Sequence, residues 1–451
     1  MEINSAVTFK HDRSPMYNKR PKVLIVGAGL AGLTLGMLLH KANIPFEIYE
    51  RAAEVKPLGS AMAFSATTAN LFKQCGIYDE FVSISKLSSV LNVCNEQRES
   101  EYKIDFRGHD EMFGAKGYIV TRPKLYDLLL RQVPQERIHL GKKILSMENG
   151  VNGVLIRCSD GSEAEGDILV GADGAYSAVR QNLYAKMLKD KRLPPSDALP
   201  LPFSTVCLVG QTRPLTPEEF PDVALEECQF RNVVGNNRPY AGPEAAAAMA
   251  AQVRDFPVVS GGDKKLTLGD LIDRTPKELM SKAMQEEKVF KTWFDCRTVL
   301  IGDACHKFNP AGGLGATNAM HDALVLANLI NGLPFHPVAN EIEAAFKAYR
   351  EERCHWVKDA YEASKIFKTM AGQKMMAKVV RFCVKNMPQW VFQQGQNRTT
   401  CNRPQCAFLP LIQDTGRVRP APQPSLSVKT PKDPENNEDK VEAIPAAAAA
   451  I

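Results

Sequence analysis

The residues from Lys22 to Glu50 form one continuous pattern that restricts the fold more than any other part of the chain. Lys22–Val26 is a short run rich in Val, Leu and Ile, which is typical of a buried parallel strand. The sequence GAGLAGLTLG follows at Gly27–Gly36, and a second strand is expected at Pro45–Tyr49, directly before Glu50. The order strand, glycine turn, helix, strand and acidic residue predicts a βαβ unit of an α/β fold.

Each glycine of this unit has its own physical task. Gly27 allows the tight turn, Gly29 leaves no Cβ between the backbone and a pyrophosphate, and Gly32 lets the helix pack closely on the strand. The free N–H groups and the positive dipole end of that helix favour phosphate, and Glu50 stands where a carboxylate binds ribose hydroxyls. The unit therefore predicts a dinucleotide site, and a βα unit without nucleotide is the alternative.

Two further glycine motifs lie downstream. Asp167–Gly171 predicts a strand that ends in the turn Ala172-Asp173-Gly174 and leads into a helix. Asp173 is suited to accept hydrogen bonds near a cofactor, although an ordinary strand-to-helix turn is an equal alternative. Late in the chain, Gly302–Ala323 has the sequence GDACHKFNPAGGLGATNAMHDA and continues into a helical pattern. This late motif indicates that the dinucleotide is FAD, held at both ends by one folded unit.

Taken in order, GAGLAG with Glu50, VGADGAYSAVR and VLIGDACHKFNPAGGLGATNAMHDA resemble the motifs of single-component FAD-dependent monooxygenases of the aromatic-hydroxylase type. Among these, the chain is most similar to fungal enzymes that act on aromatic and meroterpenoid metabolites. The resemblance covers about Pro21 to Ile330, with further similarity at Arg403–Gln405 and Phe408–Pro410. It implies an α/β fold in which an FAD-binding Rossmann-like domain carries an inserted β-sheet substrate domain and a C-terminal helical region.

The resemblance also assigns residues to the cofactor. It implies that Glu50 binds the adenosine ribose, that Ala63 approaches FAD through its backbone, and that Arg122 reaches the phosphate and ribityl region. Asp303 would accept hydrogen bonds from the ribityl hydroxyls, and backbone N–H groups at Ala316 would face the isoalloxazine edge. The predicted cofactor-binding residues are Gly27, Gly29, Gly32, Glu50, Ala63, Arg122, Asp173, Asp303, Gly315 and Ala316.

The implied activity follows from the cofactor. NAD(P)H reduces the flavin by hydride transfer, and the reduced flavin reacts with O₂ to give a C4a-hydroperoxide. One oxygen atom then hydroxylates or epoxidises a small hydrophobic substrate of aromatic or terpenoid type. No second Gly-x-Gly-x-x-Gly unit follows a strand in the sequence, so NAD(P)H is expected as a transient co-substrate without its own domain.

Two other functions remain as alternatives. One is a flavin-dependent reductase or dehydrogenase without oxygen insertion, and the other is a non-catalytic binding protein with the FAD fold. The joint presence of Glu50, Arg122 and Asp303 disfavours the second, because a mere scaffold needs no polar cofactor contacts.

The sequence identifies fewer residues on the side of the flavin ring where the substrate would bind. Arg192 and Tyr240 are the candidates to test as substrate-activating residues, with a solvated arginine and a packed strand tyrosine as the alternative interpretations. His306 is interpreted as a residue that shapes the loop beside Asp303. Related enzymes usually add a hairpin to the substrate-domain sheet where this chain runs from Tyr240 into an alanine-rich helix. The pocket wall is therefore expected to be abbreviated, with H₂O₂ released in place of some product.

Composition changes along the chain divide it into segments. The expected segments are a flexible arm (1–20), the first part of the FAD-binding domain (21–193), the substrate domain (194–295), the second part of the FAD-binding domain (296–335), a C-terminal helical region (336–416) and a disordered tail (417–451). The substrate domain opens with a proline-rich stretch and contains expected strands at Phe203–Val209 and Gln229–Val234. A long amphipathic helix is expected over Glu341–Thr369.

Charge and cysteine content restrict the partners. A net charge of +5 without a basic run interleaved with aromatics makes nucleic acid an unlikely partner. The eleven cysteines are scattered without zinc-ligand spacing, so no metal is expected, and their odd number favours an intracellular, cytoplasmic location. The amphipathic segment Lys374–Lys385 is expected to pack on its own domain, with a position on a membrane surface as the alternative.

Overall fold

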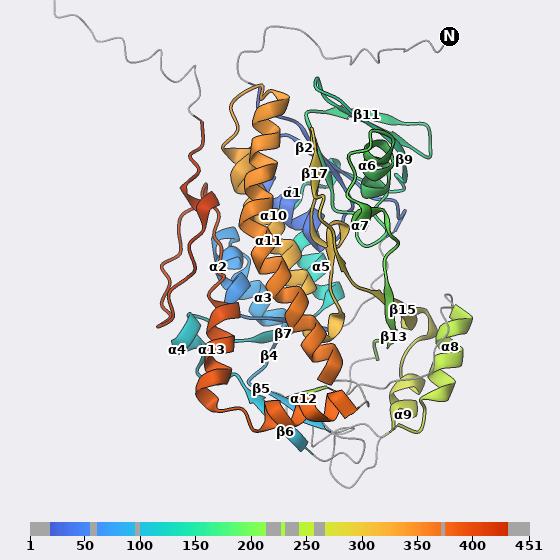
Figure 1. Ribbon diagram of the computed structural model, residues 1–451, viewed down its shortest axis with the longest axis vertical. Coiled ribbons are helices and arrows are strands. Elements are labelled where there is room, and N and C mark those ends of the chain that lie inside the picture. The colour runs from blue at the N-terminus through green and yellow to red at the C-terminus, as the bar shows by residue number, and fades with distance from the viewer. Residues whose placement is uncertain are drawn as a thin grey trace, which may run out of the picture.

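A six-stranded sheet forms the centre of the protein. The structure is a computed structural model that describes residues 19–54, 61–94, 100–212, 227–230, 243–256, 267–370 and 375–431. The strand order is β17-β18-β12-β1-β2-β8, and all neighbours are parallel except the edge pair β17 and β18 (Figure 1). These strands are β1 (Val23–Val26), β2 (Phe46–Tyr49), β8 (Ile138–His139), β12 (Ile168–Gly171), β17 (Phe294–Asp295) and β18 (Thr298–Leu300). Every residue of β1 is buried, as expected for a central parallel strand.

Three long helices pack beside this sheet. Helix α1 (Leu30–Lys41) contacts β1 and β2 and lies along α10 (Gly315–Asn331), which in turn contacts α11 (Ala339–Met370). Helix α11 extends over much of the length of the molecule in Figure 1. Its buried positions recur every three or four residues, so the helix predicted over Glu341–Thr369 is confirmed. The parallel sheet with helices packed on it confirms the predicted α/β fold.

Smaller sheets surround the central one. They are formed by β9 (Ile144–Asn149), β10 (Val154–Cys158) and β11 (Glu163–Gly166); by β3 (Ala61–Phe64), β7 (Tyr118–Thr121) and β4 (Lys86–Leu87); by β14 (Glu227–Phe230), β5 (Val90–Cys94) and β6 (Ser100–Asp105); by β13 (Phe203–Val209) and β15 (Ser281–Glu286); and by β16 (Lys288–Val289) and β19 (His306–Lys307).

Shorter helices and turns complete the described part of the chain. The helices are α2 (Ala66–Cys75), α3 (Tyr78–Ile84), α4 (His109–Phe113), α5 (Arg122–Leu130), α6 (Ala178–Lys189), α7 (Pro195–Ala198), α8 (Pro243–Gln252), α9 (Leu268–Asp273), α12 (Met375–Lys385) and α13 (Gln389–Thr400). The 3-10 turns are η1 (Gln135–Arg137), η2 (Lys277–Leu279), η3 (Gly302–Ala304), η4 (Pro310–Gly312) and η5 (Pro424–Ser427).

Two paired strands lie near the ends of the segment that is expected to form the substrate domain (194–295). Strand β13 occupies the predicted Phe203–Val209 and pairs antiparallel with β15, and both contact α8. In Figure 1, β13, β15, α8 and α9 lie together at the lower right, away from the six-stranded sheet. The second expected strand starts earlier than predicted, since β14 spans Glu227–Phe230 and pairs with β5. The remainder of that expected strand and Tyr240 lie outside the described residues.

The described part of the C-terminal tail contradicts one prediction. Composition predicts disorder from Arg417 onward, but residues 417–431 lie against the domain. Ser425 is 1% exposed and donates to Glu352 of α11 at 2.9 Å. The side-chain amide of Asn328 on α10 donates to the Ser425 hydroxyl at 3.4 Å. A proline-rich segment with no apolar pattern is thus held by polar side chains far away in sequence, which composition cannot reveal.

Candidate functional site

The first glycine turn is built by contacts that exclude any side chain. Gly27 has a φ of +105°, and a Cβ there would lie 2.5 Å from the carbonyl oxygen of Ala172. A Cβ on Gly32 would lie 1.9 Å from the carbonyl oxygen of Gly27. At Gly29, by contrast, nothing lies within 4 Å of the Cβ position. Gly27 and Gly32 therefore make the turn possible, while Gly29 keeps the space in front of α1 open for a ligand.

Glu50 lies beside this turn. Its two carboxylate oxygens accept hydrogen bonds from the backbone N–H groups of Ala28 and Ala52, each at 2.9 Å. The bond to Ala28 joins the carboxyl ends of β1 and β2, where open α/β sheets bind their ligands. This position fits the ribose contact that the resemblance implies.

Asp173 caps a helix. One carboxylate oxygen accepts from the backbone N–H groups of Ala178 at 2.6 Å and Val179 at 3.2 Å, at the start of α6. The other oxygen is buried and has no hydrogen-bond partner among the described residues. Burial raises the pKa of this carboxyl group. Asp173 therefore has a structural role and also an oxygen still able to accept a hydrogen bond.

The late glycine turn meets the first one. Gly302 has a φ of +59°, and a Cβ there would lie 3.0 Å from Ala319 of α10 and 3.5 Å from Ala31 of α1. The turn that carries Asp303 therefore lies between the N-terminal parts of α1 and α10. Asp303 is half-buried and forms no hydrogen bond or ion pair with the described residues. Its carboxylate is free to accept hydrogen bonds from a ligand.

The first residues of α10 leave room for a ligand as well. Gly315 and Ala316 open this helix and are half-buried, and nothing lies within 4 Å of the Cβ position of Gly315. The N-terminal N–H groups of an α-helix lack intrahelical acceptors, so they are available to an electron-rich ligand edge.

Ala63 and Arg122 lie on the small sheet of β3, β7 and β4. Ala63 pairs with Ile119, and Arg122 is the first residue of α5, directly after β7. The Arg122 side chain is exposed and forms no ion pair with the described residues. The helix after β3 is tied to α10, because His321 donates to the carbonyl oxygen of Thr67 at 2.9 Å. Ala63 and Arg122 thus lie on or beside a sheet separate from the one that carries the glycine turns, and their contact with the cofactor stays a prediction.

Sequence reasoning assigned no role to Asp322, the most connected buried carboxylate near the late turn. It is 0% exposed and accepts from the Gly302 N–H at 2.9 Å and from Arg353 Nε at 2.8 Å. The oxygen that accepts from Gly302 also lies 2.5 Å from His306 Nε2, and Arg353 binds the other oxygen. Burial opposes ionisation, but the charges of His306 and Arg353 outweigh it and lower the pKa of Asp322 to about 2. A carboxylate on an otherwise apolar stretch of α10 was the available signal, since such a group requires a partner.

The same cluster resembles a metal-ligand set. Ligand atoms of Cys305, His306 and Asp322 lie within 4.8 Å of one another. The Arg353 guanidinium already supplies the cation that Asp322 requires, and burial raises the pKa of the Cys305 thiol well above its ordinary value. We therefore interpret the cluster as an ion-pair network. Within it, His306 stacks on Phe308, in line with its interpretation as a loop-shaping residue.

Arg180 joins the second and third motifs. Its guanidinium donates to the carbonyl oxygens of Ala304 at 2.8 Å and Ala175 at 2.6 Å, and it lies 4.4 Å from the centre of the Phe290 ring. Arg180, the last residue of VGADGAYSAVR, thus connects the turn that carries Asp303 to the residues directly before α6. Its buried position explains why the motif ends in Arg, whose planar fork donates to two carbonyls at once.

The structure engages Arg192, one of the two substrate-side candidates, in ion pairs away from the glycine turns. Arg192 pairs with Asp295 of β17 at 2.5 Å and with Asp190 at 3.2 Å, so its charge is already neutralised at the sheet edge. Tyr240 lies outside the described residues, so the structure supplies no position for it.

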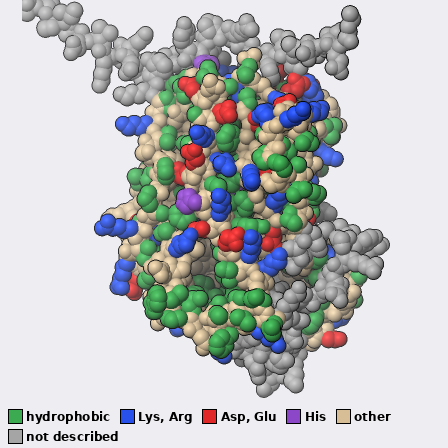
Figure 2. Space-filling view, in the orientation of Figure 1, with side chains coloured by type: hydrophobic (Ala, Val, Ile, Leu, Met, Phe, Trp, Pro, Cys, Tyr) green, Lys and Arg blue, Asp and Glu red, His purple; other side chains and the backbone are tan. Residues whose placement is uncertain are grey.

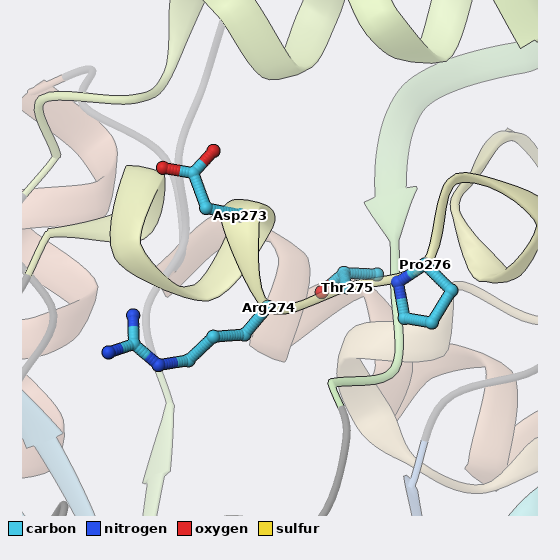
Figure 3. A pocket seen from close by; sticks show the side chains of 4 residues that line it. All are labelled: Asp273, Arg274, Thr275 and Pro276. Atoms are coloured by element: carbon cyan, nitrogen blue, oxygen red, sulfur yellow. The ribbon is translucent and has the colours of Figure 1, made fainter.

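An open hollow of about 540 Å³ lies elsewhere, in the inserted segment. It is lined by Asp273, Arg274, Thr275 and Pro276 (Figure 3). The side chains point in different directions in Figure 3, and Asp273 is engaged by Arg254 at 2.6 Å. The hollow lacks the convergent polar groups of a binding site.

Comparisons with known proteins agree with this site. A family model described as "FAD binding domain" matches residues 20–213 and 265–364. FAD-dependent monooxygenase paxM of Penicillium paxilli is 27% identical over 380 residues, which cover 76% of this chain and 77% of that protein. Aurachin C monooxygenase/isomerase of Stigmatella aurantiaca is 29% identical over 354 residues, which cover 76% of this chain and 89% of that protein.

A solved structure supports the fold. HpxO of Klebsiella pneumoniae, complexed with FAD and uric acid, superposes with a TM-score of 0.66 at 19% identity, covering 85% of this chain and 97% of that chain. The glycine turns, Glu50 and Asp303 fit a dinucleotide, and the family model spans well over half of the sequence. The chain therefore belongs to the FAD binding domain family, and its cofactor is FAD.

Proposed function

We propose that this protein is an FAD-dependent monooxygenase that uses NAD(P)H and O₂ to hydroxylate or epoxidise a small hydrophobic metabolite of aromatic or terpenoid type. The observation that carries the proposal is the contact of both glycine turns through Gly302, which lies between Ala31 and Ala319. The relatives named FAD-dependent monooxygenase support the reaction class. When bound, the flavin supplies hydride acceptance and the activation of O₂.

The chain's own residues bind and orient the cofactor. Glu50 accepts from the adenosine ribose, and the N-terminus of α1 binds the pyrophosphate across the open space at Gly29. Arg122 neutralises phosphate charge, and Asp303 accepts from the ribityl hydroxyls. The N-terminus of α10 stabilises negative charge on the reduced ring. NAD(P)H binds transiently over the same ring, because the sequence offers no second dinucleotide unit.

Titration of apoprotein with FAD tests the cofactor assignments. Asp303→Ala removes charge-assisted hydrogen bonds to the ligand but no core packing, so FAD affinity falls by about 10- to 100-fold. The thermal stability of the apoprotein stays unchanged. Asp127→Ala, an exposed carboxylate on α5, is the matched control and retains full affinity. Unchanged FAD retention in Asp303→Ala contradicts the assignment of Asp303.

Labelled oxygen distinguishes the reaction classes. Aromatic and terpenoid compounds are screened for stimulation of NADPH oxidation, and products of the best compound are analysed after reaction under ¹⁸O₂. Label in the product identifies a monooxygenase, whereas its absence identifies a reductase or dehydrogenase. If the purified protein is colourless and cannot be reconstituted with FAD, both the monooxygenase and the reductase or dehydrogenase are excluded.

The yield of H₂O₂ tests the expected abbreviated substrate domain. Incomplete exclusion of water lets reducing equivalents escape as H₂O₂, so appreciable uncoupling is expected even with a good substrate. Near-stoichiometric coupling of NAD(P)H oxidation to product overturns this expectation.

A further inference from the structure

Helix α12 and the start of α13 expose an apolar surface. The side chains of Met375, Met376, Val379, Phe382 and Trp390 are between 51 and 82% exposed. Figure 2 shows hydrophobic side chains gathered on the lower part of the molecule, in the region of α12 and α13 in Figure 1. We call these five residues the α12 apolar face. Large apolar side chains gathered in this way mark a surface that binds something.

The apolar face is a consequence of how α12 is attached. Met375, Val379 and Phe382 are four and three residues apart, so they lie on one side of the helix. The attachment uses a different side, where Arg381 donates to the carbonyl oxygen of Met370 at the end of α11 at 2.6 Å. The expectation that this segment packs its apolar side on its own domain is therefore wrong for these residues.

The charge around this face has one sign. No Asp or Glu occurs in residues 363–413, whereas the same stretch contains eight Lys and Arg. Lys365, Lys368, Arg398 and Arg403 are paired with acidic residues outside this stretch, so the remaining positive charge is concentrated on α12 itself. On α12 itself, Lys378 and Lys385 are exposed beside the apolar face. A basic amphipathic helix with exposed Met, Phe and Trp side chains has the composition of an in-plane membrane helix.

We propose that α12 docks this protein on a bilayer that contains anionic lipids. The α12 apolar face enters the boundary between headgroups and acyl chains, Trp390 lies at the headgroup level, and Lys378 and Lys385 contact lipid phosphates. The proposed contact is in the plane of the bilayer surface. Among the described helices, none has the length and apolar character needed to cross a bilayer. A second copy of the chain fits less well, since two strongly basic surfaces repel each other.

Sedimentation with vesicles tests the proposal on the full-length FAD-loaded protein. Binding is expected to phosphatidylcholine vesicles containing about one third phosphatidylserine, with much weaker binding to phosphatidylcholine alone and loss of binding at high salt. Trp390 is an internal reporter, because its fluorescence shifts to shorter wavelength on insertion and is quenched by brominated lipid. The variant Trp390→Phe removes this quenching and identifies its source.

Matched variants separate the two contributions. Phe382→Ser is expected to lower the partition coefficient on the order of tenfold, while Leu188→Ser, an equally exposed apolar residue of α6, leaves it unchanged. Lys378→Gln and Lys385→Gln each lower it about fivefold, and Lys189→Gln on α6 does not. Far-UV circular dichroism and the thermal unfolding midpoint serve as the folding controls and stay at the parent values in all these variants.

Three results overturn the proposal. The first is the absence of binding to vesicles of either composition. The second is binding that neither Phe382→Ser nor Lys378→Gln reduces, because the contact then lies elsewhere on the protein. The third is concentration-dependent self-association that Phe382→Ser abolishes in the absence of vesicle binding, which assigns the face to a second copy. Each readout is independent of the proposed reaction.

Discussion

The two glycine turns of the FAD site place a helix N-terminus at the sheet edge by different means. At the β1–α1 turn, backbone meets backbone within six residues, and a Cβ on Gly32 would lie 1.9 Å from an oxygen of Gly27. At the β18–α10 turn, Gly302 is held by Asp322, which itself depends on Arg353 of α11. The first turn is fixed by close packing and the second by buried charge.

This difference has an energetic consequence. Close backbone contact involves no charge, so it is insensitive to pH and salt. A buried ion pair must offset the cost of removing both groups from water, and it becomes strongly unfavourable when one partner is lost. We therefore expect the contact between Gly27 and Gly32 to respond to added volume and the contact between Gly302 and Asp322 to respond to changes in charge.

The largest effect is expected for Gly32→Ala. The added methyl group overlaps the carbonyl oxygen of Gly27, and backbone cannot move aside as a flexible side chain does. The loss is expected to exceed about 5 kcal/mol, so that little soluble protein is recovered. Gly29→Ala is the matched control, because nothing surrounds its Cβ position. It is expected to keep its urea midpoint and to lose FAD affinity, whereas a stable Gly32→Ala protein contradicts the role given to this contact.

Asp322→Asn is expected to have the next largest effect. The change leaves the Arg353 guanidinium buried without a counter-charge, which costs about 3–5 kcal/mol in the free energy of unfolding. FAD affinity also falls, because the Gly302 N–H loses a charged acceptor and the Asp303 turn is less firmly held. Urea unfolding and FAD titration measure the two effects.

A surface ion pair between α11, the helix that carries Arg353, and α13 is the control for this variant. Asp359→Asn removes the partner of Arg398 in an exposed ion pair and is expected to cost less than about 1 kcal/mol. Equal losses in Asp322→Asn and Asp359→Asn contradict the proposed contrast. Partial recovery in a variant that combines Asp322→Asn with Arg353→Met supports it, because no buried charge remains.

The contrast between local backbone packing and long-range ion pairs also explains which parts of the fold the sequence predicts. The β1–α1 unit, β13 and α11 were predicted closely because their signals are local: periodicity, a glycine spacing and an acidic residue at a strand end. The Asp322 network joins residues 16 to 31 positions apart and has no local pattern. An amphipathic pattern, similarly, defines the apolar side of α12 but does not say whether protein covers it.

The residues of the candidate site also fall into two groups, those predicted from a local pattern and those assigned from the resemblance alone. Gly27, Gly29, Gly32 and Glu50 follow from the physical requirements of a dinucleotide turn, and the structure brings them together. Ala63 and Arg122 came from the resemblance alone, since they lie on a separate small sheet that no spacing in the sequence connects to the glycine turns.

The buried side chain of His321 is expected to make the stability of the protein depend on pH. Burial, followed by the positive charge of Arg353, lowers the pKa of His321 to about 3. In the unfolded chain the group takes up a proton near its ordinary pKa of about 6.5, so the unfolded state binds more protons between these values and stability falls as pH decreases. The contribution is about 2 kcal/mol between pH 7 and pH 5.

His321→Gln tests this assignment. Glutamine retains an N–H donor for the carbonyl oxygen of Thr67 but does not titrate, so the variant is expected to lose this part of the pH dependence. Urea midpoints of parent and variant are compared at both pH values. Parallel curves for the two proteins mean that His321 is not the titrating group.

The smallest effect is expected for Arg192→Gln, which lies outside both turns. Its side chain is 46% exposed, so solvent reaches the guanidinium and weakens its attraction to the Asp295 carboxylate, which is itself only 11% exposed. The cost in unfolding free energy is therefore below about 1 kcal/mol and decreases further in high salt, and FAD affinity stays at the parent value. Stopped-flow reduction by NADPH and turnover with the best substrate complete the measurement. A large loss of turnover at full FAD occupancy would instead show that Arg192 acts on the substrate side, because neither stability nor cofactor binding would account for it.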